Sequence, residues 1–244
     1  MKKILAYPVS IIYYLAFGIS LVFFHIIQIF THRLVGYQAH KKTVDVLNFF
    51  LMRCLNILGT QIYFHNNFIF KRDKPYIIVA NHQSMYDIPP IIWHLRKIHP
   101  KFISKKELGK GIPSVSYNLK YGGSVLIDRR NSKGSVVAIK KFSQQISEKN
   151  LSAVIFPEGT RSRDGKLKKF YTNGLKTLIE NCPNAVVVPV SIQNSWELQK
   201  YGMFPLPLGV KIIFNVHDSI DVKEHSFEQI VSYCRTTIEN GILK

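Results

Sequence analysis

The chain has 244 residues, with 33 Lys and Arg against 15 Asp and Glu, and a formal net charge of +18. Hydrophobic residues make up 46% and aromatic residues 12%, which excludes a disordered chain and allows a sizeable buried core. Three widely separated cysteines, Cys54, Cys182 and Cys234, exclude a disulfide scaffold and Cys-rich zinc patterns. The charge favours an anionic partner, which nucleic acid, an anionic membrane surface or a phosphorylated substrate would all satisfy.

The first predicted element is an apolar helix over residues 4–30, a run without Asp, Glu, Lys or Arg. Such a helix would span about 40 Å, more than the roughly 30 Å hydrocarbon core of a bilayer. A cleaved signal peptide fits poorly, because the apolar part is too long and no small-residue cleavage site follows it. Basic residues flank both ends, Lys3 and Arg33 among them, so the positive-inside rule favours both ends on the same face.

The second predicted helix, over residues 44–58, is too short to span a bilayer and is amphipathic. Its apolar face consists of Val44, Leu47, Leu51, Leu55 and Leu58. We therefore predict that residues 1–59 form a membrane-associated motif of two helices, which dip into one leaflet and are joined by a basic connection over residues 32–42. A true transmembrane span and a buried core helix of a soluble protein are the alternatives.

Residues 60–244 are predicted to form an α/β domain. Short runs rich in Ile, Val and Phe are typical of strands, and helical stretches separate several of them. This alternation indicates a mostly parallel sheet flanked by helices. The predicted strands are 62–70, 76–80, 101–104, 123–127, 153–156, 185–192 and 210–216, and the predicted helices are 134–148, 174–181 and 226–242.

Polar residues follow two of these strands, at the carboxyl edge where α/β sheets bind ligands. In the first loop, Asp87 is spaced to fold back onto Nδ1 of His82, which would leave Nε2 free to take a proton from a hydroxyl. In the second loop, Gly159 permits close backbone approach and Arg161 offers a planar fork for a phosphate. The alternatives are a turn histidine with a helix-capping aspartate, and a solvated turn with a surface arginine.

A third strand ends at Asp128, which either holds Arg129 in place or forms an exposed pair with it. Basic residues, including Lys101 and Lys105, cluster after each of the three segments. Charge concentrated beside strand ends indicates a positive cleft, although a run of charge is more often a solvated face.

Four segments carry a family resemblance. The segment NHQSMYD, residues 81–87, resembles the H-x4-D block of the glycerolipid acyltransferases, in particular those that act on 1-acylglycerol 3-phosphate. The segment FPEGTRS, residues 156–162, is similar to a second block of that family, residues 123–129 to a third and residues 187–190 to a fourth, in the same order. The resemblance implies the family's mostly parallel α/β sheet.

The resemblance also implies an activity, which is transfer of a fatty acyl group from acyl-CoA or acyl-carrier protein to the sn-2 hydroxyl of lysophosphatidic acid, giving phosphatidic acid. It implies that His82 is the general base and that Asp87 supports it. The residues that it implies in substrate binding are Lys105, Arg129, Glu158, Gly159, Thr160 and Arg161. Activity is expected to fall as His82 becomes protonated at low pH.

No metal is expected, because the nine histidines show no paired ligand spacing such as H-x3-H, and no cofactor is expected apart from the acyl-thioester co-substrate. The expected partners are a lysophospholipid, the acyl donor and membrane lipid, with no nucleic acid, at the cytoplasmic face of the cell membrane. Three alternatives stay open: another lysophospholipid or an aminolipid as acceptor, a basic binding protein without activity, and a hydrolase with Ser84 as nucleophile. The sequence departs from the family pattern at Thr172, where a basic residue is usual.

Overall fold

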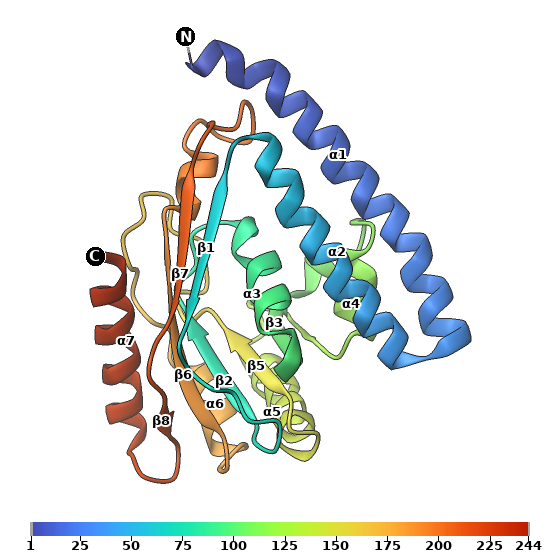
Figure 1. The fold of residues 1–244 in the computed structure, drawn as a ribbon. Coiled ribbons are helices and arrows are strands. Elements are labelled where there is room, and N and C mark those ends of the chain that lie inside the picture. Colours follow the sequence, from blue (N-terminus) through green and yellow to red (C-terminus); the bar gives the residue numbers. More distant parts are fainter. Residues whose placement is uncertain (1, 244) are drawn as a thin grey trace.

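An eight-stranded sheet forms the centre of the structure, a computed structural model that describes residues 2–243 (Figure 1). The strand order is β1-β7-β6-β2-β5-β3-β4, and β8 pairs with the start of β6. All pairings are parallel except those of β6 with β7 and β8, so the mostly parallel sheet is confirmed. The strands are β1 (Gln61–Asn66), β2 (Tyr76–Ala80), β3 (Pro100–Lys105), β4 (Val125–Ile127), β5 (Ser152–Ile155), β6 (Val186–Gln193), β7 (Lys211–Val216) and β8 (Ile220–Asp221).

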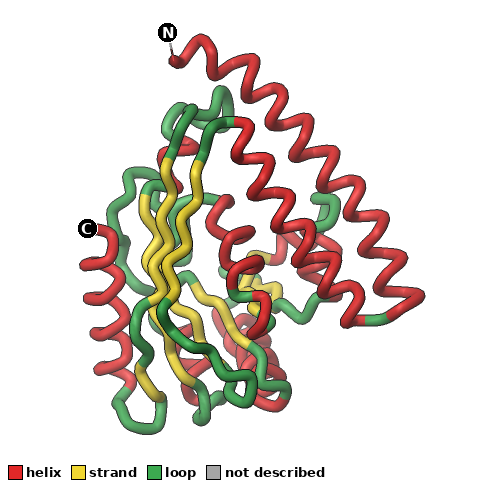
Figure 2. Tube along the Cα trace, in the orientation of Figure 1, coloured by secondary structure: helices red, strands yellow, loops and turns green. Residues whose placement is uncertain are grey.

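Helices cover both faces of the sheet (Figure 2). They are α1 (Lys2–Phe30), α2 (Tyr37–Ile57), α3 (Ile88–His94), α4 (Val115–Tyr121), α5 (Ser132–Glu148), α6 (Asn173–Glu180) and α7 (Phe227–Leu243). Strand β2 is buried on both sides, because alternate side chains of a strand point to opposite faces. Ile78 packs in a core shared with α2 and α3, whereas Ile77 and Val79 pack in a core shared with α5, α6 and α7.

Most predicted elements are present, and the differences have local causes. Helix α3 was not predicted, because its first turn contains Pro89 and Pro90. Proline is tolerated at these positions, since the first amides of a helix have no helical partner. The short α4 and β8 were also not predicted, and the predicted strand 62–70 ends at Asn66. A capping box precedes α7, with Ser226 and Gln229 each accepting a hydrogen bond from the other's backbone amide.

The connection between α1 and α2 is much shorter than predicted. A π-helical turn, Thr31–Val35, continues α1, and the helical path breaks at Gly36, whose φ of +102° favours glycine. The prediction of a basic connection over residues 32–42 is therefore wrong, because residues 37–42 form the first turns of α2. Lys41 and Lys42 consequently project from a helix.

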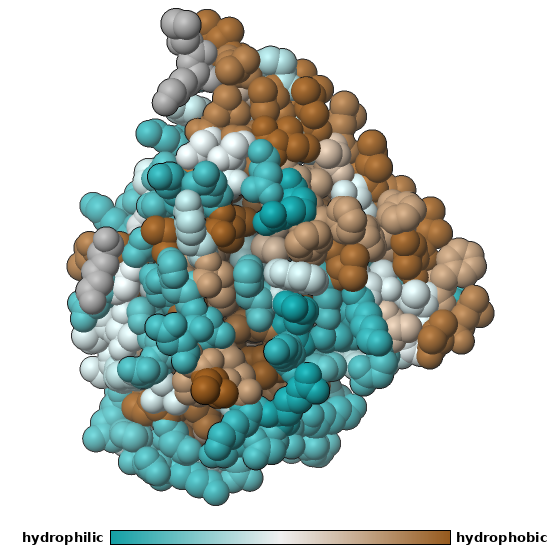
Figure 3. All heavy atoms as spheres, in the orientation of Figure 1, coloured by the Kyte–Doolittle hydropathy of each residue, from teal (hydrophilic) through white to brown (hydrophobic). Residues whose placement is uncertain are grey.

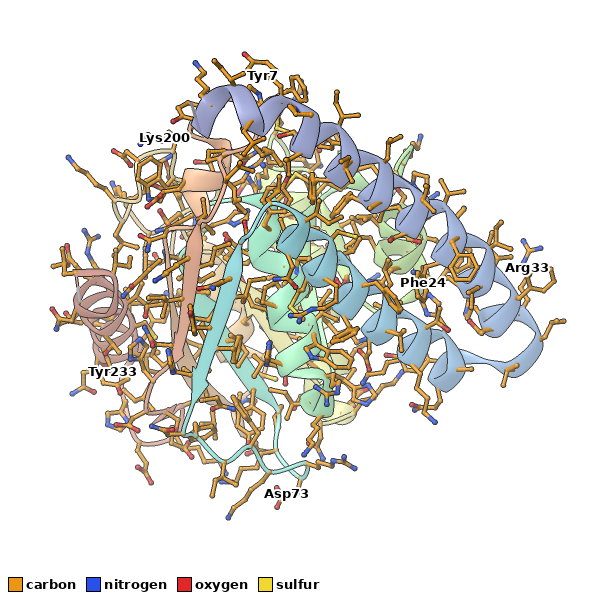
Figure 4. The ribbon with its side chains drawn as sticks, turned by 45° about the horizontal axis from the view of Figure 1, so that its top comes forward. Tyr7, Phe24, Arg33, Asp73, Lys200 and Tyr233 are labelled. Atoms are coloured by element: carbon orange, nitrogen blue, oxygen red, sulfur yellow. The ribbon has the colours of Figure 1, made fainter. Side chains whose placement is uncertain are left out.

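Helix α1 has one packed side and one apolar exposed side. Phe24 packs against Leu47 and Leu51 of α2 and lies between the two helices in Figure 4. The outer side carries exposed apolar residues from Ile4 to Phe30, visible as the hydrophobic edge in Figure 3. By length and composition, the helical segment Lys3–Val35 is long and apolar enough to cross a membrane.

The predicted apolar face of the second helix, Val44, Leu47, Leu51, Leu55 and Leu58, is buried. Tyr13 of α1 and Leu55 of α2 belong to the same core as Ile78 of the sheet, so the helical pair and the sheet share one core. The division into residues 1–59 and 60–244 stays a prediction.

Candidate active site

Three loops meet at one edge of the sheet, because β2, β5 and β6 are parallel neighbours and end together. Asn81, directly after β2, donates from Nδ2 to the carbonyl oxygen of Ile192 at 2.8 Å and accepts from the amide of Ile192 at 2.7 Å. The amide of Ser162, in the loop after β5, donates to the carbonyl oxygen of His82 at 2.7 Å. These bonds hold the His82 loop between its two neighbours.

Asp87 lies against the imidazole of His82, with Oδ2 2.8 Å from Nδ1. The Asp87 side chain is 0% exposed, and the same oxygen accepts the amides of Gln83 at 2.7 Å and Ser84 at 2.9 Å. Its other oxygen accepts a hydrogen bond from the hydroxyl of Ser195. Asp87 also closes the capping box of the 3₁₀ turn Met85–Asp87. The two interpretations of Asp87, as a helix cap and as the residue that orients His82, are therefore both correct.

The imidazole of His82 is fixed on a second side by Phe156, whose ring stacks on it with centroids 4.2 Å apart. The His82 side chain is 18% exposed. A carboxylate on Nδ1 selects the tautomer in which Nε2 carries the free lone pair. The arrangement therefore presents an oriented base at the mouth of the site.

Ser84 is not placed as a nucleophile. Its side chain is buried, and its Oγ accepts the amide of Tyr86 at 3.0 Å as the cap of the 3₁₀ turn. The hydroxyl thus serves the backbone of the His82 loop.

Glu158 ties two loops together from within the protein. Its side chain is buried, with Oε1 accepting the amide of His82 at 2.7 Å and Oε2 accepting the amide of Lys168 at 2.9 Å. Burial raises the pKa of the carboxyl, although both hydrogen bonds oppose that shift. Glu158 therefore shapes the site through the backbone.

Replacing Glu158 by glutamine is expected to lower the free energy of unfolding by about 1–3 kcal/mol, because the side-chain amide can accept only one of the two backbone donors. Thermal unfolding of the purified protein in detergent would measure the change. Glu180→Gln is the matched control, since Glu180 is exposed and pairs loosely with Lys176 at 3.9 Å. Equal unfolding midpoints for the two variants would contradict this role of Glu158.

Two arginines belong to or contact the loop after β5, which is itself hydrogen-bonded to the His82 loop. The Nη1 of Arg129 donates to the carbonyl oxygen of Gly159, which links the loop after β4 to the loop after β5. Gly159 has a φ of +68°, a left-handed conformation that favours glycine. Arg161 is exposed, and Lys168 Nζ donates to its carbonyl oxygen at 2.7 Å. The site therefore gathers cationic side chains, as predicted for a positive cleft.

The remaining predicted residues lie at the same edge but with different contacts. Lys105 ends β3 in register with Ile127, so it lies near Arg129, and its side chain is exposed. Thr160 is exposed, with Oγ1 3.4 Å from Lys168 Nζ. Asp128 does not hold Arg129 but pairs with Lys106 and accepts the amide of Arg130 at 3.0 Å, because its carboxylate points along its own turn.

Sequence reasoning missed Phe156 and Ser195 as parts of the site. Phe156 is the first residue of the FPEGTRS segment, and Ser195 follows β6 as His82 follows β2. A search for polar groups after every parallel strand would have found Ser195.

An oriented imidazole beside exposed cations, at the carboxyl edge of a parallel sheet, is suited to removing a proton from a hydroxyl on a phosphorylated ligand. Residues 61–193, more than half of the chain, match the family model described as acyltransferase, and the chain belongs to the acyltransferase family.

Similar proteins include two enzymes named 1-acyl-sn-glycerol-3-phosphate acyltransferase. One, from Helicobacter pylori, is 36% identical over 133 residues, which are 51% of this chain and 54% of that protein. The other, from Limnanthes douglasii, is 30% identical over 57% of this chain and 50% of that protein. The chain thus spans about half the length of these curated relatives. The crystal structure of the 1-acyl-sn-glycerophosphate acyltransferase PlsC from Thermotoga maritima matches 99% of this chain and 96% of its own, with a TM-score of 0.81 and 26% identity.

Proposed function

We propose that this chain transfers a fatty acyl group from an acyl thioester to the free sn-2 hydroxyl of lysophosphatidic acid, giving phosphatidic acid for phospholipid synthesis. The observation that carries the proposal is the buried Asp87 carboxylate 2.8 Å from Nδ1 of His82, with Arg129 and Arg161 at the same edge of the sheet. The substrates named for the two similar enzymes support the choice of acceptor.

In the proposed reaction, the acceptor hydroxyl gives its proton to Nε2 of His82 while its oxygen attacks the thioester carbonyl carbon. The negative charge of Asp87 stabilises the imidazolium that forms. The tetrahedral intermediate collapses by breaking the carbon–sulfur bond, and the leaving thiolate takes the proton from His82. No acyl-enzyme forms, which accords with the buried capping role of Ser84.

The phosphate of the acceptor would lie against Arg129, Arg161 and Lys105. Guanidinium groups bind phosphate with two parallel hydrogen bonds, and the contact of Arg129 with Gly159 fixes the direction of its side chain. Thr160 and Gly159 would form the floor of this pocket. Acyl-CoA or acyl-carrier protein would serve as the donor, with no further cofactor, metal or nucleic acid.

The membrane placement that we propose is monotopic, at the cytoplasmic face. Contacts between α1 and the protein body run along the helix, from Ser10 Oγ with the Leu206 amide at 2.9 Å to His25 Nδ1 with the Ser114 amide at 3.1 Å. A perpendicular span would carry these contacts into the bilayer. A helix that lies in one leaflet keeps them and buries only its exposed apolar side.

The decisive experiment measures thiol release from a long-chain acyl-CoA, with and without lysophosphatidic acid. Release that requires the acceptor supports the proposal, and release without acceptor would indicate hydrolysis. No release with either donor, acyl-CoA or acyl-carrier protein, would contradict it. A second candidate, another lysophospholipid or an aminolipid as acceptor, is favoured by Thr172 at the usually basic position and would be recognised by product formed only with that acceptor.

Replacing Arg161 by glutamine is expected to raise the KM for lysophosphatidic acid by about 10–100-fold, because a charge-assisted hydrogen bond to phosphate is lost. Arg163→Gln is the matched control, since Arg163 is an exposed arginine of the same loop. Initial rates at varied acceptor concentration would measure both. Equal KM values would remove Arg161 from the phosphate site.

A further inference from the structure

A second positively charged site lies at the opposite edge of the sheet. A cavity of about 770 Å³ is bordered by the first turns of α2, by the end of the 3₁₀ turn Arg96–Ile98 and by the end of α5. Its lining includes Ile98 and Leu151, which lie just before β3 and β5. His82 follows the carboxyl end of β2, which is parallel to β5, so the length of the strands separates the two sites.

The cavity gathers more cations than its single carboxylate can neutralise. Its charged lining is Lys41, Lys42, Arg72, Arg96, Lys97 and Lys149, against Asp45 as the acidic member. Asp45 is already engaged, because Lys41 Nζ lies 2.5 Å from its Oδ2. Within residues 2–243, no ion pair joins Lys42, Arg72, Lys97 or Lys149 to a carboxylate. Like charges that line one concave surface produce a strong positive potential there.

The inner wall adds buried polar groups. A small cavity of about 20 Å³ shares Tyr37, Lys41, Asp45 and His99 with the large one, and Lys101 lines it. Lys101 is only 6% exposed, and its ammonium group lies 5.3 Å from the ring centroid of Tyr37. Burial, reinforced by Lys41, lowers the pKa of Lys101 to about 8.

His99 is a second unusual group on this wall. Its Nδ1 is buried and has no hydrogen-bond partner within the described chain. Its backbone has a φ of +49°, a left-handed conformation that is unfavourable for a residue with a side chain. A bound anion would compensate the charge of Lys101 and provide an acceptor for His99.

The position of the cavity indicates the source of such an anion. Tyr37, Lys41 and Lys42 directly follow the tip of the helical pair, where Leu34 and Val35 are 76% and 74% exposed. In Figure 3, hydrophilic side chains border the lower right part of the hydrophobic edge. The amino terminus of α2 carries no acidic residue in its first turn, although a helix amino terminus favours an anion.

We propose that this cavity binds a phosphate group, supplied by the headgroup of an anionic phospholipid, at a site separate from that of the acyl acceptor. Lys42, Lys97 and Lys149 would contact the phosphate. Lys101, on the inner wall, would stabilise the negative charge of the phosphate. The choice of a lipid as the source rests on the proposed membrane contact of α1, whereas the phosphate chemistry does not depend on acyl transfer.

The test compares two triple variants of the full chain with the same change in net charge. Lys42→Gln, Lys97→Gln and Lys149→Gln alter the cavity, whereas Lys140→Gln, Lys141→Gln and Lys223→Gln alter exposed lysines elsewhere. Binding to phosphatidylcholine vesicles, with and without 30% phosphatidylglycerol (about one anionic lipid in three), is measured by flotation. The wild type and the control are expected to prefer the anionic vesicles by at least about tenfold, and the cavity variant to lose most of that preference.

A second measurement separates a lipid from a soluble source. Inorganic pyrophosphate is added to the protein in detergent, and its thermal unfolding is followed. If pyrophosphate raised the unfolding temperature of the wild type but not of the cavity variant, and the vesicle preference were unchanged, the cavity would bind phosphate from a soluble ligand and not from a lipid. Equal losses of vesicle preference in the two triple variants, or no loss in either measurement, would overturn the proposal.

Two further variants make the result independent of folding and of catalysis. Lys101→Met keeps the length of the buried side chain but removes its charge. Whichever response the cavity variant loses, the preference for anionic vesicles or the protection by pyrophosphate, is expected to be about tenfold weaker in Lys101→Met. His82→Ala is expected to keep both binding responses. A failure of the acyl-transfer assay and a failure of the phosphate site would therefore be distinguishable.

Discussion

Replacing His82 by alanine is expected to lower kcat for acyl transfer by about 10²–10⁴-fold, because the variant lacks the group that takes the proton from the acceptor hydroxyl. Within residues 2–243, the His82 side chain is hydrogen-bonded to Asp87 and stacks on Phe156, so its removal leaves the backbone bonds of the loop in place. Initial rates at saturating acyl-CoA and lysophosphatidic acid would measure the effect.

The matched control is His65→Ala, because His65 is an exposed histidine of the edge strand β1, whereas His82 follows the central strand β2. This variant is expected to keep the wild-type rate. If His82→Ala retained more than about a tenth of the wild-type kcat while it remained folded, His82 could not be the general base.

Replacing Asp87 by asparagine is expected to lower kcat by about 10²–10⁴-fold without unfolding the protein, because only the negative charge behind the imidazolium is lost. An asparagine oxygen in place of Oδ2 can still accept the amides of Gln83 and Ser84. The new amide nitrogen would face the hydroxyl of Ser195, which can accept a hydrogen bond. Rates and the thermal unfolding midpoint, measured together, would separate catalysis from stability.

Asp221→Asn provides the comparison, since Asp221 also accepts a backbone amide, that of Lys223 at 3.0 Å, but lies on β8. Asp87→Ala is less informative, because it leaves two buried amides without an acceptor. A rate for Asp87→Asn within a few-fold of the wild type would show that the carboxylate only shapes the loop.

Local spacing allowed the central contact of the site. The strand before His82 and the four-residue gap to Asp87 left two alternatives open, the family resemblance chose between them, and the structure shows the contact at 2.8 Å. The helical face from Val44 to Leu58 was also predictable, since helical periodicity depends on the sequence alone. The family resemblance named the substrate-binding residues but not their contacts.

The sequence alone was enough to predict the α/β class and the apolar first helix from periodicity, and the His82–Asp87 pair from short spacing together with the family resemblance. Only the tertiary structure brought Ser195 to Asp87, 108 residues away, and Glu158 to the amide of His82, 76 residues away. It also assigned Lys101 to the opposite edge from Lys105, because β3 runs between them. Long-range contacts depend on strand order and direction, and these are decided when the whole sheet packs, not by any local pattern.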